Sequence, residues 1–350
     1  MSIAQYVAAL PKAELHVHLE GAIQPATLLT LAQRNNIPLP GQTVEEIQRW
    51  FTFRNFQHFI EIYVVISSCL KTAEDFEYIT YEFGATMARQ NIRYAEVTFT
   101  PSTHHLGPYK LPLEVFFGGL QRGRARAQAD FGVEMRWVFD ISRGIPNEQR
   151  RRRAADYTTA IAIECMPEGV VALGLGGSEI GYPPEYFASW FKQARAAGLH
   201  SAPHAGETVG PESVWGALKA LGAERIGHGV RSIENPALVD YLAEHAIPLE
   251  ISPVSNLRLG VYPAIEQHPL PQLYAAGVPF TVNSDDPPLF NTTLNGNMEL
   301  LHNAFHYDIA AIDEIVLNGV RHSFLPSAPK QSMEDLFRTQ MAELKQQFLA

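Results

Sequence analysis

Residues Ala13–Leu19 read AELHVHL, a short β-prone run that ends at the polar pair Glu20-Gly21. Seven further runs of this kind follow along the chain, and most are mixed apolar stretches of a few residues. Such stretches are typical of strands that are covered on both faces. The eight predicted strands are Ala13–Leu19, Tyr94–Thr100, Glu134–Ile141, Val170–Leu175, Ser201–Ala205, Arg225–Gly229, Pro248–Ser252 and Pro279–Asn283.

Helical patterns lie between these strands, and several begin at Pro and end before Gly. Alternation of strand and helix predicts a parallel sheet, and eight such units close most naturally into a barrel. The alternative, an open doubly wound sheet, would have a Gly-rich phosphate turn after the first strand, and Glu20-Gly21-Ala22 is not one. We therefore predict an α/β fold, a (β/α)8 TIM barrel. Its predicted helices include Glu114–Phe131, Glu148–Glu164, Pro183–Gly198, Pro211–Leu221, Pro236–Glu244 and Pro269–Ala276.

The connection between the first two predicted strands is unusually long. It spans about residues 22–92 and contains helical patterns at Pro25–Asn35, Val44–Phe51, Phe56–Leu70 and Ala73–Gln90. Long insertions at the C-terminal ends of barrel strands are commonly lids or substrate walls. The aromatic stretch Trp50–Phe56 within it is either a satellite hydrophobic cluster or an apolar lid over a planar substrate. No repeat or linker divides the chain, so we expect residues 1–350 to form one domain with a helical tail over about residues 325–350.

Composition narrows the class of protein. The chain has 350 residues, 46% hydrophobic and 18% charged, which supports a large core and excludes global disorder. Its formal net charge of -10 disfavours a nucleic-acid partner, and we interpret the basic run Arg150–Arg153 as a solvated helix face. Two distant cysteines, Cys69 and Cys165, cannot form a disulfide framework. The N-terminus does not resemble a targeting signal and no stretch is apolar enough for a membrane helix, so we expect a cytoplasmic protein.

Several histidines and carboxylates fall at predicted strand ends. His16 and His18 are two positions apart in the first strand, so both side chains point to the same face. His204 ends the fifth strand, and Asp285-Asp286 follow the eighth. A barrel presents its active site at these C-terminal strand ends. Three imidazoles and one carboxylate are a ligand set typical of catalytic zinc.

The number of metal ions and the groups beside them can also be inferred. Barrels that bind two metals commonly bridge them with a modified Lys on the fourth strand, and Val170–Gly177 has none, so we expect one metal. Glu207, three residues after His204, is placed to shuttle protons, or else it caps the helix that starts near Pro211. His228, between two glycines, either takes a proton from water or holds hydroxide, or it is a packed strand histidine.

Four motifs together resemble the adenosine deaminase family, which includes adenosine, adenine and aminodeoxyfutalosine deaminases of the metal-dependent amidohydrolase superfamily. They are the stretch PKAELHVHLEGA at Pro11–Ala22, HAGE at His204–Glu207, RIGHG at Arg225–Gly229 and NSDDP at Asn283–Pro287. The resemblance extends over roughly residues 9–325. It implies a (β/α)8 barrel that holds one Zn²⁺ per chain and hydrolytically deaminates a 6-aminopurine.

The resemblance also implies which residues hold the metal and carry the chemistry. The implied zinc ligands are His16, His18, His204 and Asp285, of which His18 also faces the substrate. A bound zinc ion lowers the pKa of its water, which then attacks C6 of the purine.

The other implied roles concern the purine ring. Glu207 is similar to the family's proton shuttle to N1, and His228 to the residue that orients and deprotonates the attacking water. Asp286 resembles the residue that accepts from the attacking hydroxyl or holds N7. Gly177 matches the glycine whose backbone amide approaches N3.

Two departures affect the sugar side. Glu20 stands where most adenosine deaminases have an Asp that binds the ribose 5′-hydroxyl, and Gly177-Ser178-Glu179 stands where many have Gly-Asp-Glu. The expected substrate is therefore adenosine or an adenosine-type nucleoside, including 5′-modified ones such as aminodeoxyfutalosine, with free adenine as the alternative. A non-catalytic nucleoside-binding relative and a different metal hydrolase are the other classes. His104 either lines the pocket or lies in a surface loop.

Overall fold

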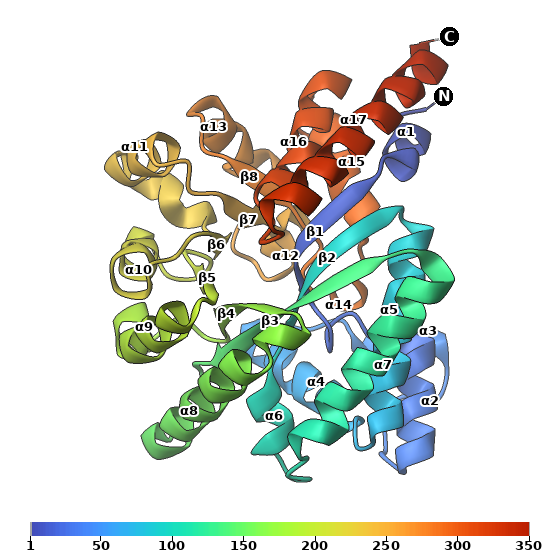
Figure 1. Ribbon diagram of the computed structural model, residues 1–350, viewed down its shortest axis with the longest axis vertical. Helices are drawn as coiled ribbons and strands as arrows, with labels where there is room; N and C mark the ends of the chain where they lie inside the picture. Colours follow the sequence, from blue (N-terminus) through green and yellow to red (C-terminus); the bar gives the residue numbers. More distant parts are fainter. Residues whose placement is uncertain (1, 350) are drawn as a thin grey trace.

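The computed structural model describes residues 2–349 and contains eight parallel strands that pair in chain order. Each predicted strand is confirmed to within three residues at either end. Helices surround the strands on the outside (Figure 1). The predicted TIM barrel is therefore confirmed. The strands are β1 (Lys12–His18), β2 (Ile92–Phe99), β3 (Glu134–Ser142), β4 (Val170–Gly176), β5 (His200–Ala205), β6 (Ile226–His228), β7 (Leu249–Ile251) and β8 (Phe280–Val282).

The barrel closes where the first strand meets the residues after the last. Val17 forms a parallel bridge with Asp285. The backbone N–H of His18 donates to the carbonyl of Asp285 at 2.9 Å, and the N–H of Asp285 donates to the carbonyl of His16 at 3.1 Å. The side chain of Asn283 accepts a further bond from the N–H of His16 at 3.1 Å. Closure of the barrel thus fixes the backbone of three sequence-predicted metal ligands, His16, His18 and Asp285.

The helices between the later strands agree with the sequence pattern in position. Two predicted helices are each split: Pro183–Gly198 becomes a 3₁₀ turn, η2 (Pro184–Phe187), followed by a helix, and Pro211–Leu221 ends in a π-helical turn, η3 (Ala217–Leu221). The helices are α7 (Leu113–Phe131), α8 (Glu148–Glu164), α9 (Ala188–Ala197), α10 (Pro211–Gly216), α11 (Pro236–Glu244) and α13 (Leu270–Ala275).

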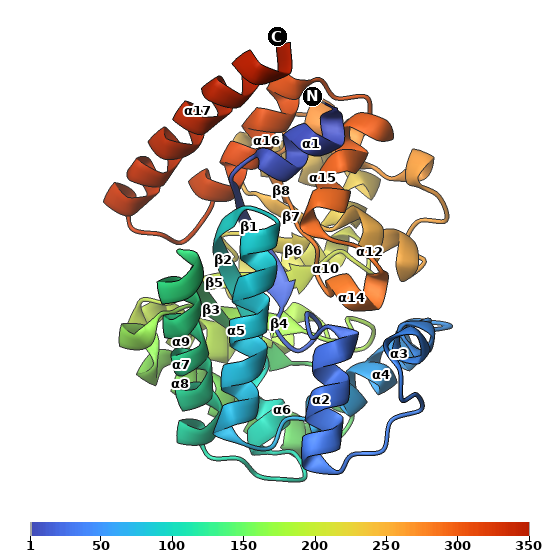
Figure 2. The same cartoon turned by 90° about the vertical axis from the view of Figure 1, so that its right-hand side faces the viewer.

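Four helices occupy the connection between β1 and β2. Figure 2 shows α2, α3 and α4 grouped on the side of the molecule opposite the C-terminal helix α17 (Ser327–Leu349). The apolar face of α4 covers the C-terminal end of the barrel, as its contribution to the cavity described below indicates. The four helices are α2 (Pro25–Asn35), α3 (Val44–Trp50), α4 (Phe56–Ser68) and α5 (Ala73–Arg89).

The remaining helices were not predicted individually. The eighth unit ends in α16 (Ile309–Arg321), which packs on β1 and β8. A Cβ on Gly319 would lie 2.7 Å from the carbonyl oxygen of Ala13, so only glycine permits this close approach. None of the helices within residues 2–349 combines the length and apolar character that crossing a bilayer requires. The others are α1 (Ile3–Ala9), α6 (Pro101–His105), α12 (Pro253–Arg258), α14 (Pro287–Phe290) and α15 (Leu294–Asn303).

Candidate active site and metal centre

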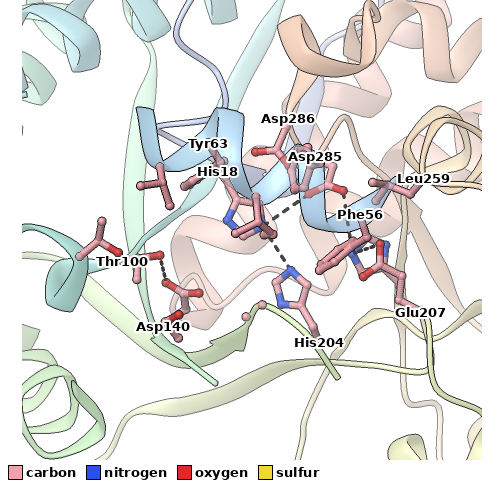
Figure 3. A pocket seen from close by; sticks show the side chains of 18 residues that line it. His18, Phe56, Tyr63, Thr100, Asp140, His204, Glu207, Leu259, Asp285 and Asp286 are labelled. Atoms are coloured by element: carbon pink, nitrogen blue, oxygen red, sulfur yellow. Dashed lines mark hydrogen bonds and ion pairs between the residues drawn. The ribbon is translucent and has the colours of Figure 1, made fainter. Parts of the chain in front are cut away.

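A cavity lies at the C-terminal ends of the strands, with an empty volume of about 780 Å³ including its mouth. Its floor consists of polar side chains from the barrel, and α4 contributes an apolar wall (Figure 3). Most of the sequence-predicted site residues line it: His18, Gly177, His204, Glu207, His228, Asp285 and Asp286. The α4 wall consists of Phe56, Phe59, Ile60, Tyr63 and Val64.

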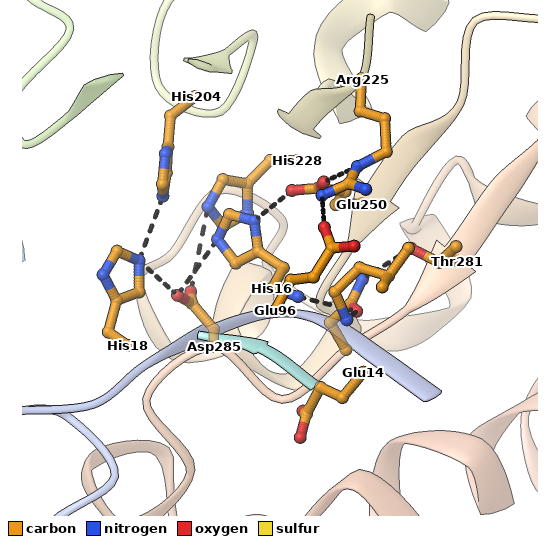
Figure 4. Close-up of polar contacts among 12 residues, drawn as sticks. Glu14, His16, His18, Glu96, His204, Arg225, His228, Glu250, Thr281 and Asp285 are labelled. Carbon is orange, nitrogen blue, oxygen red and sulfur yellow. Dashed lines mark hydrogen bonds and ion pairs between the residues drawn. The ribbon is translucent and has the colours of Figure 1, made fainter. Parts of the chain in front are cut away.

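The four sequence-predicted metal ligands converge on one point beside this cavity. His16 Nε2 and His18 Nε2 lie 3.5 and 3.4 Å from Asp285 Oδ1. The Nε2 atoms of His18 and His204 are 3.2 Å apart (Figure 4). His228 also belongs to this group, because one potential ligand atom from each of His16, His204, His228 and Asp285 lies within 4.8 Å of the others.

The donor set fits a metal cation. Among the described residues, His16 Nε2 and His204 Nδ1 are buried and have no hydrogen-bond partner. Such orphaned polar atoms are costly unless something satisfies them. Burial lowers the pKa of the His18 imidazole to about 4, so it is neutral near pH 7 and free to act as a ligand. A divalent ion between the Asp285 carboxylate and the Nε2 atoms that face it would satisfy His16 Nε2, and His204 faces the same point through Nε2 and not through Nδ1.

Buried ion pairs fix His16 on the side of the ring that faces away from the metal cluster. His16 Nδ1 donates to Glu250 at 2.7 Å, and Arg225 donates to both Glu250 and Glu96 at 2.6 Å. Burial alone would lower the pKa of His16, but the nearby carboxylates of Asp285 and Glu250 raise it to about 10. Because Nδ1 carries the proton shared with Glu250, Nε2 faces the centre. Carboxylates behind metal-binding histidines have this orienting effect.

A second series of hydrogen bonds determines which ring nitrogen of His228 carries the proton. The N–H of Leu270 donates to His268 Nδ1 at 3.2 Å, which leaves the proton of this neutral imidazole on Nε2. His268 Nε2 then donates to Asn256 Oδ1 at 3.1 Å, and Asn256 Nδ2 donates to His228 Nδ1 at 3.4 Å. Burial lowers the pKa of both imidazoles to about 4. The network therefore assigns the proton of neutral His228 to Nε2, which faces Glu207 Oε1 at 3.7 Å.

Glu207 lies in a loop that a single buried carboxylate organises. Glu179 accepts hydrogen bonds from the backbone N–H groups of residues 206–209, at 2.6 to 3.1 Å. Although burial would raise it, the charge of Arg143 and these N–H groups hold the pKa of Glu179 below its usual value. Burial raises the pKa of Glu207 to about 8, and the charges of Asp285 and Glu179 add to this effect. Glu207 therefore carries a proton near neutral pH, as a general acid requires.

The adjacent carboxylates Asp285 and Asp286 differ in protonation. Burial acts to raise the pKa of Asp285, but the contact with His16 and the other nearby imidazoles hold it well below its usual range. Burial and then the charge of Asp285 raise the pKa of Asp286 well above its usual range. Gly21 leaves room for this protonated side chain, because a Cβ there would lie 1.6 Å from Asp286 Oδ1. Asp286 is thus a buried hydrogen-bond donor.

Gly177 follows β4 and has a φ of +84°, in the left-handed region that favours glycine. Arg143 Nε donates to the Gly177 carbonyl at 3.2 Å, and Arg143 NH2 lies 3.6 Å from Glu179. The buried arginine therefore links the Gly177 turn to the Glu207 loop.

The structure places Glu20 behind the cavity wall and not among its lining residues. Its carboxylate is fully buried and accepts bonds from His104 Nε2 at 3.0 Å and the Tyr63 hydroxyl at 3.3 Å. His104 is also buried and stacks on Phe99, so it lies neither on the surface nor on the cavity wall. The side chain of Tyr63 stands between Glu20 and the cavity.

Sequence reasoning missed Asp140, a second carboxylate that does line the cavity. Thr100 donates a hydrogen bond to its Oδ1 at 2.5 Å. Burial raises the pKa of Asp140 to about 7, and the charge of Glu20 contributes to the increase. An acidic residue inside a strand was the available signal. Asp140, Glu250 and Glu96 all fit it, but sequence alone does not say which of them faces the cavity.

Comparisons with known proteins agree with this geometry. The family model described as "Adenosine deaminase" matches residues 11–340. The chain belongs to the adenosine deaminase family. It is therefore an aminohydrolase, and the resemblance inferred from the four motifs is confirmed.

Individual relatives cover nearly the whole length of this deaminase. An aminodeoxyfutalosine deaminase from Streptomyces coelicolor is 41% identical over 340 residues, covering 96% of this chain and 86% of the relative. The crystal structure of an adenine deaminase from Arthrobacter aurescens is 30% identical with a TM-score of 0.86, covering 97% and 100% of the two chains. The crystal structure of an amidohydrolase from Burkholderia ambifaria with bound zinc is 25% identical, with a TM-score of 0.88. The match covers 99% of this chain and 95% of the amidohydrolase.

Proposed function

We propose that this enzyme uses one zinc ion to deaminate the 6-amino group of an adenosine-type nucleoside, giving the 6-oxopurine and ammonia. The observation that carries the proposal is the convergence of a metal-ligand cluster and a protonated Glu207 on one cavity. His16, His18, His204 and Asp285 hold the ion. The bound ion supplies an activated water, the nucleophile for hydrolysis.

The side chains of the cavity bind the purine and move protons. Glu207 donates its proton to ring nitrogen N1, which makes C6 more electrophilic. Asp286, protonated, donates to N7, and the backbone amide of Gly177 approaches N3. His228 orients the attacking water through its Nε2–H. Of the two protons that the water loses, one restores the Glu207 carboxyl and the other completes the departing ammonia. The α4 wall excludes bulk water from the ring.

Free adenine is the second candidate substrate, and one observation favours it. The carboxylate of Glu20 is already satisfied by Tyr63 and His104, so it offers no acceptor to a ribose 5′-hydroxyl. The adenine deaminase among the relatives is consistent with this alternative. Two observations disfavour free adenine as the substrate. The chain is 41% identical to an aminodeoxyfutalosine deaminase, and the polar Thr100–Asp140 pair lies at the far end of the cavity, beyond the expected position of the purine.

A substrate panel tests both candidates. Loss of adenine-type absorbance is followed with adenosine, 5′-deoxyadenosine, 5′-modified adenosines and adenine, and kcat/KM is compared. Preference for any nucleoside over adenine supports the proposal, and turnover of adenine alone supports the alternative. Elemental analysis of active enzyme should give one equivalent of zinc per chain, and two equivalents would contradict the single-metal site.

A further inference from the structure

A partly buried phenylalanine lies at the end of the barrel opposite the active site. Phe324 belongs to the short connection between α16 and α17. Its ring stacks on His200, the first residue of β5, with 4.1 Å between the ring centroids and 3° between the ring planes. His204, a proposed metal ligand, lies near the other end of the same strand. The Phe324 ring also packs against a small apolar cluster from β3, β4 and β5, which consists of Val138, Ala172 and Ala202.

Several contacts join this connection to Arg225, the residue before β6. The Arg225 guanidinium lies over the Phe324 ring, 3.7 Å from its centroid. Two groups this close to one ring cannot share a face, so the ring lies between His200 and Arg225. Arg225 Nη1 donates to the His322 carbonyl at 2.8 Å. The N–H of Phe324 donates to one oxygen of Glu96 at 2.5 Å, and the other oxygen of Glu96 accepts from Arg225 at 2.6 Å. These contacts fix the guanidinium relative to the connection.

From Arg225 the contacts continue to the metal cluster (Figure 4). Arg225 Nε donates to one oxygen of Glu250 at 2.6 Å, and the other oxygen of Glu250 accepts from His16 Nδ1 at 2.7 Å. The side chains of Arg225, Glu250 and His16 are all buried. Carboxylates behind metal-binding histidines set the direction of the imidazole. A displacement of the guanidinium therefore moves the carboxylate that orients His16.

The position of the guanidinium depends on the Phe324 ring for two reasons. A cation over an aromatic face is attracted to it, and the attraction is stronger when the cation is shielded from water. Phe324 is itself partly exposed, so loss of its ring opens one face of Arg225 to solvent. Water then competes with Glu250 for the donors of Arg225, and the ion pair weakens as the local dielectric rises.

We propose that Phe324 is a positioning residue for the metal centre. Through Arg225 and Glu250 it holds the His16 ring in the orientation that presents Nε2 to the metal ion. Phe324 does not line the cavity, so it acts on metal binding and not on the purine directly. The inference rests on the proposed metal site, and it extends the residues that support this site to the connection before the C-terminal helix.

The test removes the ring and measures metal binding directly. Wild type, Phe324→Ala and Phe324→Tyr are stripped of metal, and the zinc Kd of each is measured by competition with a chromophoric chelator. The visible spectrum of each protein saturated with Co²⁺ is then recorded, because it reports the geometry of the ligands. Phe131→Ala is the matched control, since Phe131 is a partly buried phenylalanine at the end of α7 that packs on Tyr81 at 5.2 Å.

We expect Phe324→Ala to bind zinc about tenfold more weakly than the wild type, at the lower limit of what loss of a group behind a metal ligand costs. Its cobalt spectrum should differ from that of the wild type. At saturating zinc, kcat on the best substrate of the panel should fall while KM stays within about twofold. Phe324→Tyr keeps the ring and should restore all of these properties.

The control separates positioning from a general loss of stability. Phe131→Ala should lower the thermal midpoint, as Phe324→Ala does, and keep the zinc Kd and the cobalt spectrum of the wild type. If Phe324→Ala does not fold, Phe324→Leu takes its place, because Leu fills most of the volume but presents no aromatic face to Arg225. It should weaken zinc binding in the same direction.

Two outcomes overturn the inference: a wild-type zinc Kd and cobalt spectrum in the folded variant without the ring, or a loss that Phe324→Tyr does not restore. Failure of the proposed function gives a different result. In that case the wild type itself binds no zinc, or its zinc-loaded form deaminates none of the 6-aminopurines.

Discussion

At the scale of single residues, the site separates groups that sequence alone leaves equivalent. Asp285 and Asp286 are neighbours of the same type, yet one stays ionised beside the imidazoles and the other keeps its proton. Glu179 and Glu207 differ in the same way, because only Glu179 receives backbone N–H groups and faces Arg143. Environment therefore assigns the acid and base roles.

Replacing Glu207 with Gln tests the proton transfer. The amide keeps the shape but has no carboxyl proton to give, so kcat should fall by about 10² to 10⁴-fold. Zinc content and thermal midpoint should stay at wild-type values. Glu212→Gln, an exposed position in α10, is the control. Retention of more than about a tenth of the wild-type rate would exclude Glu207 as the main proton donor.

The pH profile gives an independent check on the same residue. The proposed mechanism requires the protonated form of Glu207, so kcat/KM should fall as pH rises through the pKa of this residue. That pKa is about 8 without a metal ion, and a nearby cation lowers it. The alkaline limb should therefore lie below pH 8 and disappear in Glu207→Gln.

At the scale of elements, each active-site group depends on a segment that holds it. The loop after β5 is one example, since Glu179 binds its backbone N–H groups. The short helix α12 is another, since it supplies Asn256 to His228. Neither residue lines the cavity. Their effects on catalysis are therefore positional.

Glu179→Gln should loosen the loop that carries Glu207. An amide replaces a charged acceptor with a weaker one and adds donors that face the same N–H groups, at a cost of about 3 kcal/mol. We expect a lower thermal midpoint and a lower kcat with zinc content unchanged. Glu164→Gln, at an exposed position in α8, should leave both at wild-type values. Unchanged kcat in Glu179→Gln would show that the loop keeps its form without the charge.

Asn256→Asp should reverse the tautomer of His228. A carboxylate accepts from Nδ1–H and raises the pKa of the imidazole, so Nε2 loses its proton in the neutral form. We expect kcat to fall at least about tenfold, KM to change little and the acid limb of the profile to move to higher pH. Asn235→Asp is the control, because Asp caps α11 as well as Asn does. An unmoved acid limb would contradict the assigned chain.

At the scale of the whole molecule, the proposed metal ligands come from segments far apart in the chain: the first strand, the fifth strand and the residues after the eighth. Chelation should therefore lower the thermal midpoint as well as abolish activity, because it leaves His16 Nε2 buried without a partner. Adding zinc should restore the activity and the thermal midpoint. At a free zinc concentration of a hundred times Kd, binding should raise the free energy of unfolding by about 2.7 kcal/mol. His204→Ala is the control, and chelator should not shift its midpoint further. Equal midpoints with and without metal in the wild type would count against a structural contribution.

The barrel and the metal cluster could be predicted because they depend on local patterns. Each strand is a short apolar run, and His16, His18, His204 and Asp285 all fall at strand ends. The short helices α6, α12 and α14 were missed, although each begins with a Pro in the segment that follows a strand, which is a recognised start signal. Their four to six residues are too few for an amphipathic pattern.

The sugar side could not be predicted, because it depends on contacts between distant segments. Glu20 faces away from the cavity only because α4 supplies Tyr63 and α6 supplies His104. No local pattern in the sequence contains this arrangement.

Closure of the barrel through Val17 and Asp285 has a consequence for synthesis of the protein. A ribosome makes the chain from its N-terminus, and domains generally fold as units as they emerge. His16 and His18 emerge early, but Asp285 and the bridge that aligns it follow only after most of the chain has been made. The nascent chain therefore holds two exposed imidazoles without their carboxylate for almost the whole of translation. With the proposed ligand set, the metal ion binds at the end of translation or after the chain is released, and a chain truncated before Asn283 should be unable to retain it.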